Sequence, residues 1–215
     1  EADLPLPFWL STDIGGRKWQ QITQLAASVG LPQRPVLEWC AGKGHLGKVM
    51  SYAFQAPVVS LEWQQSLCNV GQQNAQQLGL LQLFVHIDVL KQPVAPYLQP
   101  AQQVVALHAC GDLHRVAARE AVRAGCAALA LVPCCYHLIP DTHYQPLSEA
   151  AAAQDLQLNK DDLKLVVQGQ VTAGERIEKL RATEVLWRLA YDELRIELSG
   201  QSHYRPLASV AKHWF

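Results

Sequence analysis

Short apolar runs alternate along the chain with segments of helical periodicity, and this alternation restricts the fold more than any other feature of the sequence. The runs cover residues 34–40, 57–63, 81–90, 102–111 and 126–137. In the segments between them, apolar residues recur at spacings of three and four, as in an amphipathic helix. Nearly continuous apolar strands separated by helices indicate a mostly parallel sheet with helices on both faces. The predicted class is therefore α/β.

The first run leads into "VLEWCAGKGHLG", residues 36–47, in which Gly42, Gly44 and Gly47 have the spacing G-x-G-x-x-G. This spacing is typical of dinucleotide binding, in which a helix N-terminus holds the pyrophosphate. Glu38, at the end of the strand, would repel that anion. The same carboxylate favours the ammonium and sulfonium groups of S-adenosylmethionine. A tight strand-to-helix turn without a ligand is the remaining interpretation.

Two more carboxylates follow the next two strands. Glu62 ends the run in "VVSLEW", where it could accept hydrogen bonds from both hydroxyls of a ribose. Asp88 ends the run in "FVHIDVL", where it could bind the adenine amino group or serve only as a turn residue. Glu62 alone would suit NAD equally well. Acidic residues at three successive strand ends favour S-adenosylmethionine over NAD, with S-adenosylhomocysteine as the product.

The predicted cofactor-binding residues come from the ends of the first four strands and the loops after them. They are Glu38, Cys40, Ala41, Gly42, Gly44, His45, Leu46, Glu62, Trp63, Asp88, Val89, His108 and Ala109.

Polar residues gather at the fourth and fifth strand ends, in "LHACGDLHR" and "VPCCYH". We expect them to converge on one pocket beside the methyl donor. Asp112 and His137 are the candidate proton acceptors, whereas His108 and Tyr136 would orient the acceptor or contact the cofactor. Asp112 has a second interpretation, as the N-cap of the helix that begins near Leu113.

Three cysteines lie in the same two stretches: Cys110, Cys134 and Cys135. Their spacing differs from the paired C-x-x-C pattern of zinc sites, and neighbouring residues of a strand point to opposite faces. The sequence therefore predicts thiols that line a tight pocket, with no bound metal. A redox or covalent role for a thiol remains open.

A family resemblance rests on "EWCAGKGHLG", "SLEWQ", "LHACGDLH" and "VPCCYH". Together these stretches resemble the class I methyltransferase domain that follows a glutathione-S-transferase-like region in some eukaryotic proteins. They are also similar to bacterial stand-alone relatives and to the methyltransferase-like-25 group. "LHACGDL" and "CCYH" are more distantly similar to the eukaryotic tRNA 2′-O-methyltransferase of the acceptor stem. The resemblance covers roughly residues 10–195. It implies a Rossmann-like fold, S-adenosylmethionine as the methyl donor and RNA as the acceptor, with tRNA as one candidate.

Composition limits the other partners. The formal net charge is -1, so the chain lacks a strongly basic footprint for nucleic acid. A protein or small-molecule acceptor, or a module that binds the cofactor without catalysis, is the alternative. No apolar run is long enough for a membrane span, and the six cysteines suit a reduced, cytoplasmic protein. The oligomeric state is not predicted.

The chain divides into a predicted methyltransferase core, residues 1–158, and a helical extension of the same domain, residues 159–215. The fold usually finishes with two more strands, and "YRPLASVAKHWF" is a poor candidate for them. We therefore expect either that the final strands are missing or that they come from elsewhere, and the start at Glu1 suggests a fragment.

Overall fold

The computed structural model describes residues 4–168, 175–203, 205 and 207–208. The chain forms two compact units, residues 1–167 and 168–215. The predicted core, residues 1–158, ends shortly before this division. None of the described helices is both long and apolar enough to cross a membrane.

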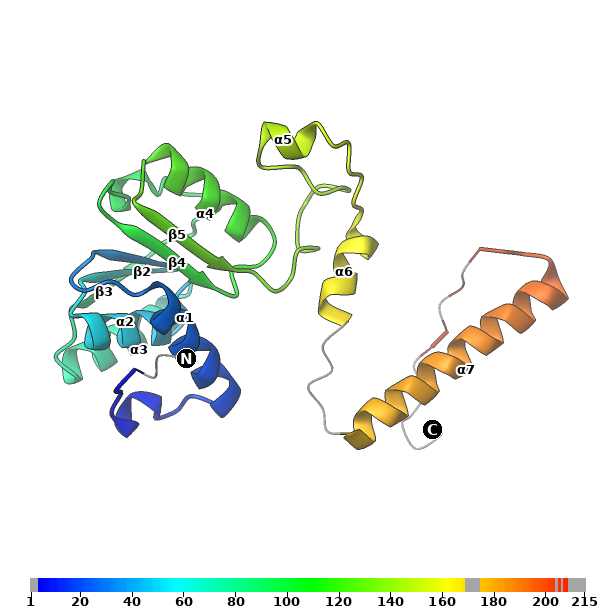
Figure 1. Ribbon diagram of the computed structural model, residues 1–215, viewed down its shortest axis with the longest axis horizontal. Coiled ribbons are helices and arrows are strands. Elements are labelled where there is room, and N and C mark those ends of the chain that lie inside the picture. Colours follow the sequence, from blue (N-terminus) through cyan, green and yellow to red (C-terminus); the bar gives the residue numbers. More distant parts are fainter. Residues whose placement is uncertain (1–3, 169–174, 204, 206, 209–215) are drawn as a thin grey trace. The chain divides into compact units, whose positions relative to one another are not determined.

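A parallel sheet of five strands, in the order β3-β2-β1-β4-β5, forms the centre of the first unit (Figure 1). Its strands are β1 (Val36–Trp39), β2 (Val58–Glu62), β3 (Gln82–His86), β4 (Gln103–Leu107) and β5 (Ala128–Val132). This arrangement confirms the predicted fold class. Among the described residues, none after Val132 joins the sheet; parts of the stretch "YRPLASVAKHWF" lie outside the described residues.

Helices cover both faces of this sheet, as a parallel sheet requires. One face carries α1 (Gly16–Val29), α2 (His45–Phe54) and α3 (Gln65–Gln77), and the other carries α4 (Asp112–Arg123) (Figure 1). Single turns of 3-10 helix occur at Phe8–Ser11 and Ala95–Tyr97, and α5 (Glu149–Ala152) and α6 (Lys160–Gln168) follow the sheet.

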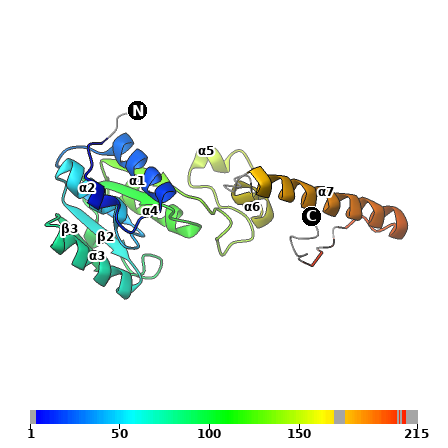
Figure 2. The same cartoon turned by 90° about the horizontal axis from the view of Figure 1, so that it is seen from below.

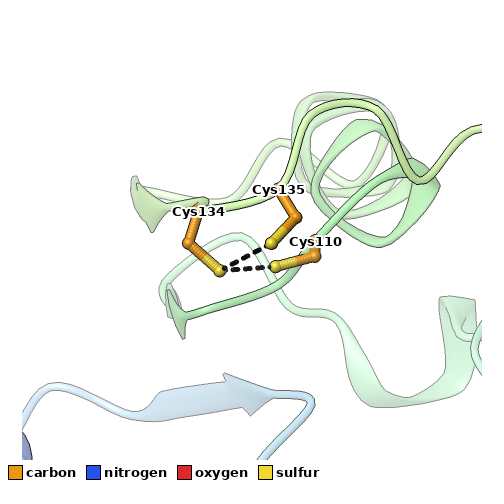
Figure 3. A group of neighbouring side chains, drawn as sticks. All are labelled: Cys110, Cys134 and Cys135. Carbon is orange, nitrogen blue, oxygen red and sulfur yellow. Dashed lines mark hydrogen bonds between the residues drawn. The ribbon is translucent and has the colours of Figure 1, made fainter. Parts of the chain in front are cut away.

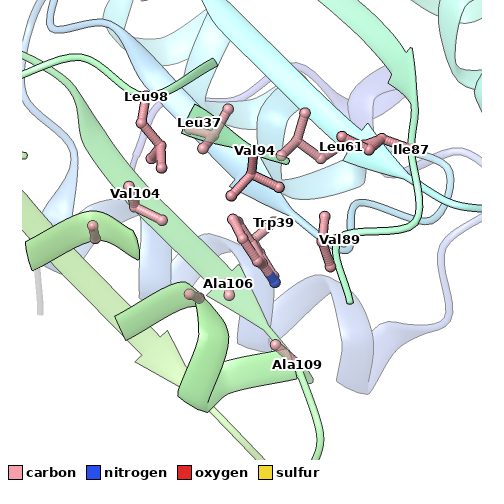
Figure 4. Close-up of a cluster of buried hydrophobic side chains, with 12 residues drawn as sticks. Leu37, Trp39, Leu61, Ile87, Val89, Val94, Leu98, Val104, Ala106 and Ala109 are labelled. Carbon is pink, nitrogen blue, oxygen red and sulfur yellow. The ribbon is translucent and has the colours of Figure 1, made fainter. Parts of the chain in front are cut away.

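Alternate residues of the central strands divide between two hydrophobic cores. Leu37, Trp39, Val104 and Ala106 pack on the face covered by α4 (Figure 4). Val36 and Val105, each one position away from a residue of that face, contribute to the core under α1 and α2. The same core contains Ile22, Ala26, Val49, Met50 and Val58. The alternation follows from the opposite directions of successive side chains in a strand.

The second unit contains a long helix, α7 (Glu175–Ser199), drawn in orange in Figure 2. Before it, Asn159 caps α6: its side-chain oxygen accepts hydrogen bonds from the N–H groups of Asp161 and Asp162 at 2.8 and 3.1 Å. Asp162 returns the interaction by accepting from the Asn159 N–H at 2.9 Å. These reciprocal hydrogen bonds fix the start of α6.

Candidate cofactor site at the strand ends

The site lies where the connections of β1 and β4 leave the sheet in opposite directions. These strands are neighbours in the sheet but not in the sequence, so a crevice opens outside their carboxyl ends. Two cavities occupy this region, of about 450 and about 210 Å³. Both are lined by Cys40 and Gly42, so they adjoin at the loop after β1.

The loop after β1 adopts a backbone that glycine favours. Gly42 and Gly44 have φ values of 59° and 70°, and Cys40, in place of the glycine usual there, has a φ of 55°. At Gly44 a Cβ atom would lie 2.2 Å from the Phe84 ring, so a larger residue would push the loop off β3. Burial, followed by the charge of Glu62, raises the pKa of Cys40 to about 12, which keeps this thiol protonated.

Glu62 is fixed by two backbone N–H groups. Its Oε2 accepts from Gly42 at 2.8 Å and its Oε1 from Gln64 at 2.9 Å. The side chain is 5% exposed and lines the larger cavity. A carboxylate has about four acceptor positions, so each oxygen can accept one further hydrogen bond from a ligand.

Asp88 stands at the other side of the larger cavity. One oxygen accepts from the Leu90 N–H at 3.1 Å and the other pairs with Lys91 at 3.1 Å. These two hydrogen bonds lower the pKa of Asp88. Strand β3 ends at His86, so Asp88 lies two residues beyond the strand rather than at its last position. Trp63, which is largely exposed, also lines this cavity.

Glu38 is buried beneath the loop and lines the smaller cavity. Its Oε2 accepts from the Ser60 hydroxyl at 2.6 Å. Burial raises the pKa of Glu38 to about 7, although the Ser60 hydroxyl and the N–H groups of Gly47 and Leu46 oppose that rise. The carboxyl group thus holds the start of α2 against the sheet.

Lys18 and His45 complete the polar lining of the smaller cavity. Burial, aided by the charges of Lys18 and two other lysines, lowers the pKa of His45 to about 4, so its imidazole is neutral at pH 7. Sequence reasoning missed Lys18, because it lies on a helix before the first strand and no motif marks it. The cavity therefore combines one ammonium group with one buried carboxyl group.

Most residues predicted to bind the cofactor line one of the two cavities. The larger one is lined by Cys40, Gly42, Glu62, Trp63, Asp88 and Val89, and the smaller one by Glu38, Cys40, Ala41, Gly42, His45, Leu46 and His108. Gly44 and Ala109 line neither. The apolar walls were not predicted; they include Ile22 and Leu107 in the smaller cavity and Leu61, Leu67, Ile87 and Leu113 in the larger.

The polar residues after β4 and β5 do not converge on one pocket as expected. His108 lines the smaller cavity and hydrogen-bonds Gln21 at 3.1 Å, but Asp112, Tyr136 and His137 line neither cavity. The Tyr136 ring packs edge-on against the imidazole of His114 on α4, with ring centroids 5.3 Å apart. His137 has a buried Nδ1 atom without a hydrogen-bond partner in the described part of the chain.

Asp112 is the first residue of α4, and Gly111 is the N-cap, so the interpretation of Asp112 as N-cap is wrong. Its Oδ1 accepts a hydrogen bond from Arg115 Nη1 at 2.5 Å, and the same nitrogen donates to Asp141 at 3.2 Å. The Arg115 side chain is only 5% exposed, so this ion pair ties α4 to the segment after β5.

Cys110, Cys134 and Cys135 meet beside the cavities (Figure 3). Their sulfur atoms all lie within 4.8 Å of one another; Cys110 and Cys134 are 2.7 Å apart, and Cys134 and Cys135 are 3.5 Å apart. Burial raises the pKa of Cys134 to about 12, whereas hydrogen bonds from Cys134 and Cys135 outweigh burial at Cys110 and lower its pKa. Strand β5 ends at Val132, so the strand argument for opposed cysteine side chains is wrong.

Comparison with known proteins agrees with the class that the fold and the strand-end carboxylates define. Residues 17–142 match the model of a family described as "Methyltransferase domain". The chain belongs to this family, which confirms the predicted class of enzyme, a methyltransferase.

A curated relative, a glutathione S-transferase C-terminal domain-containing protein of Xenopus laevis, is 27% identical over 139 residues. The match covers 62% of this chain but only 22% of that protein. Among solved structures, protein-L-isoaspartate O-methyltransferase is 26% identical with a TM-score of 0.37, covering 44% of this chain and 30% of its own. Mycolic acid cyclopropane synthase is 17% identical with a TM-score of 0.44, covering 53% and 41%.

Proposed function

We propose that the two adjoining cavities bind S-adenosylmethionine and that the domain transfers its methyl group to an acceptor. The observation that carries this proposal is the distribution of charge along the site. Carboxylates of Glu62 and Asp88 border the larger cavity, and Lys18 and Glu38 border the smaller one. The loop of Cys40 and Gly42 joins the two.

The larger cavity suits the adenosine part of the cofactor. Glu62 is held by two backbone N–H groups and keeps acceptor positions for the two ribose hydroxyls. Asp88 can accept from the adenine amino group, and Ile87 and Leu113 offer apolar walls for the base. Because Glu62 and Gly42 are hydrogen-bonded to each other, binding the ribose also fixes the glycine loop.

The smaller cavity suits the amino-acid part. Its ammonium group, Lys18, can pair with the cofactor carboxylate, and the buried carboxyl of Glu38 lies on the same cavity wall as the neutral His45. S-adenosylmethionine supplies an electrophilic methyl group on its sulfonium. The chain then positions the acceptor. Asp112 and His137, the predicted proton acceptors, line neither cavity, so their role stays a prediction.

Calorimetry with S-adenosylhomocysteine tests the cofactor proposal. Glu62→Gln and Asp88→Asn should each weaken binding on the order of 10- to 150-fold, because each loses a hydrogen bond to a charged group worth about 1.5–3 kcal/mol. Lys18→Gln should weaken binding of S-adenosylhomocysteine but leave adenosine binding unchanged, because adenosine lacks the carboxylate.

Glu149→Gln is the matched control, since Glu149 is exposed in the first turn of α5 and away from both cavities. Parental affinity in both Glu62→Gln and Asp88→Asn would remove the proposed site. An equal loss for adenosine in Lys18→Gln would mean that Lys18 supports the cavity instead of binding the carboxylate.

For the acceptor we propose RNA, in a protein of the cytoplasm. The support is the resemblance of "LHACGDL" and "CCYH" to the tRNA enzyme, together with Arg119 and Arg123, which are exposed on α4. Arg115, on the same helix, is buried in its ion pairs and cannot serve a phosphate. The six free cysteines support a reducing compartment.

Transfer of tritium from labelled S-adenosylmethionine to separated RNA, protein and small-molecule fractions tests the acceptor. Incorporation into RNA, reduced in Arg119→Ala, is the expected result. Label in protein or small molecules alone would contradict RNA, and binding of the cofactor without transfer to any fraction would favour a non-catalytic module.

A further inference from the structure

We propose that Cys110, Cys134 and Cys135 form a binding site for one Zn²⁺ ion beside the cofactor cavities. Within the described parts of the chain, these are the three metal-ligating side chains whose sulfur atoms lie mutually within 4.8 Å. They are partly buried, and each is a free thiol. The site does not depend on the proposed function.

The backbone holds these sulfur atoms together from two segments far apart in the sequence. Cys110 lies between β4 and α4, whereas Cys134 and Cys135 follow β5. The Gly111 N–H donates to the Cys135 carbonyl at 2.8 Å. A Cβ atom at Gly111 would lie 1.6 Å from the Leu138 carbonyl oxygen, so the two segments are in direct contact.

The sulfur positions are close to those that zinc requires. Tetrahedral zinc binds thiolate sulfur at about 2.3 Å, which places two sulfur ligands about 3.8 Å apart. The Cys134–Cys135 distance of 3.5 Å is near this value, and the 2.7 Å between Cys110 and Cys134 needs to open by about 1 Å. Rotation of the side chains can supply such a change without moving the backbone.

The position of Cys110 favours the thiolate form that a metal ion requires. Hydrogen bonds join the three thiols, and a divalent cation would displace their protons as each sulfur becomes a thiolate. Cys110 lies just before the N-terminus of α4, whose positive end favours a thiolate. Zinc and sulfur are well matched in softness, unlike Mg²⁺ or Ca²⁺.

Three protein ligands leave the fourth tetrahedral position to an exchangeable water, a ligand count found in open rather than closed zinc sites. The bound ion would fix the segment from His108 to Leu113, which contributes His108 to the smaller cavity and Leu113 to the larger one. Zinc would thereby fix one border of the cofactor site.

Titration of the untagged, reduced full chain with Co²⁺ tests this site, with a phosphine as reductant to avoid competing thiols. We expect one equivalent to bind, with an intense thiolate-to-cobalt absorption that an equivalent of Zn²⁺ abolishes. The absorption should be lost in Cys110→Ser, Cys134→Ser and Cys135→Ser. It should persist in Cys68→Ser and Cys126→Ser, which alter thiols outside the cluster.

Folding of each variant is checked by circular dichroism and by cooperative unfolding in urea. No thiolate–cobalt absorption in the folded parental chain would overturn the proposal, whatever the variants do. Absorption unchanged in all three cluster variants would overturn it as well. Cobalt binding without binding of S-adenosylhomocysteine would leave the metal site standing and contradict only the proposed cofactor.

Discussion

At the scale of single residues, the Glu38 carboxyl group titrates in a way that couples the site to stability. Its pKa is about 7 in the folded chain and about 4.5 when exposed. Between these values only the folded state retains the proton, so stability present below pH 4.5 is lost as the pH rises to about 7. The loss amounts to roughly 3 kcal/mol. Glu38→Gln removes this titration, so it should gain roughly 2–3 kcal/mol relative to the parent between pH 5 and pH 8.

Urea unfolding of both proteins across that range measures the difference, and all other titrating groups cancel in the comparison. Parallel pH profiles for the parent and Glu38→Gln would mean that Glu38 ionises at its ordinary pKa. The carboxyl group would then have to be more accessible to water than its 3% exposure indicates.

Single carboxylates could be predicted from the sequence because a strand end marks them. Glu62 is the last residue of β2 and lines the larger cavity, as the pattern indicates. Lys18 could not be predicted, because its place in the site depends on how α1 packs against α2 rather than on any residue near it. The ion pairs of Arg115 could not be predicted either, since its second partner, Asp141, comes from a segment after β5.

At the scale of elements, the turn from β4 into α4 depends on Gly111. Its φ is 57°, and a Cβ atom there would lie 1.6 Å from the Leu138 carbonyl oxygen. Gly111→Ala should therefore cost about 1–3 kcal/mol for a backbone conformation, φ 57° and ψ −133°, that is essentially limited to glycine, and a further 1–3 kcal/mol for overpacking. Gly125→Ala is the control for a positive φ without a steric contact, because Gly125 has a φ of 65° with open space around it and should show only a backbone cost.

Urea denaturation of the two variants and the parent checks this difference. Equal losses of unfolding free energy would show that the contact at Leu138 relaxes without cost. The two segments that carry the cysteines would then be less tightly joined than the distances indicate.

The alternation of strands and helices could be predicted from periodicity, but strand ends could not. The apolar runs continue past β4 and β5, while the backbone leaves the sheet at His108, which has a φ of 66°, and at Pro133, which has no N–H to donate. Residues 146–158 include a run of alanines suited to a helix, but only Glu149–Ala152 is helical, because the alanines are exposed and have no apolar face to bury.

At the scale of the whole molecule, the sequence places the end of the core at residue 158, whereas the first compact unit extends to residue 167. Two contacts carry the chain past that point: the Tyr144 N–H donates to the Leu158 carbonyl at 2.8 Å, and Leu163 is buried, with 7% exposure. Periodicity identifies such a helix but does not tell which unit it packs against. The residue at which a compact unit ends therefore depends on tertiary contacts, which the local sequence pattern does not reveal.

Ligand binding should raise the stability of the folded chain selectively. A ligand that binds only the folded state at 100 times its Kd adds about 2.7 kcal/mol, which corresponds to a rise in Tm of roughly 5–10 °C for a chain of this size. We expect this rise with S-adenosylhomocysteine in the parent and a smaller one at the same concentration in Glu62→Gln. NAD should give no rise, because the Glu38 carboxyl group lies beneath the glycine loop where a pyrophosphate would bind, and no lysine or arginine lines the larger cavity. Differential scanning fluorimetry over a concentration series measures the three changes in Tm.

A saturable rise in Tm with NAD that equals the rise with S-adenosylhomocysteine would show that the loop accepts a pyrophosphate. The charge argument for S-adenosylmethionine as the cofactor would then fail.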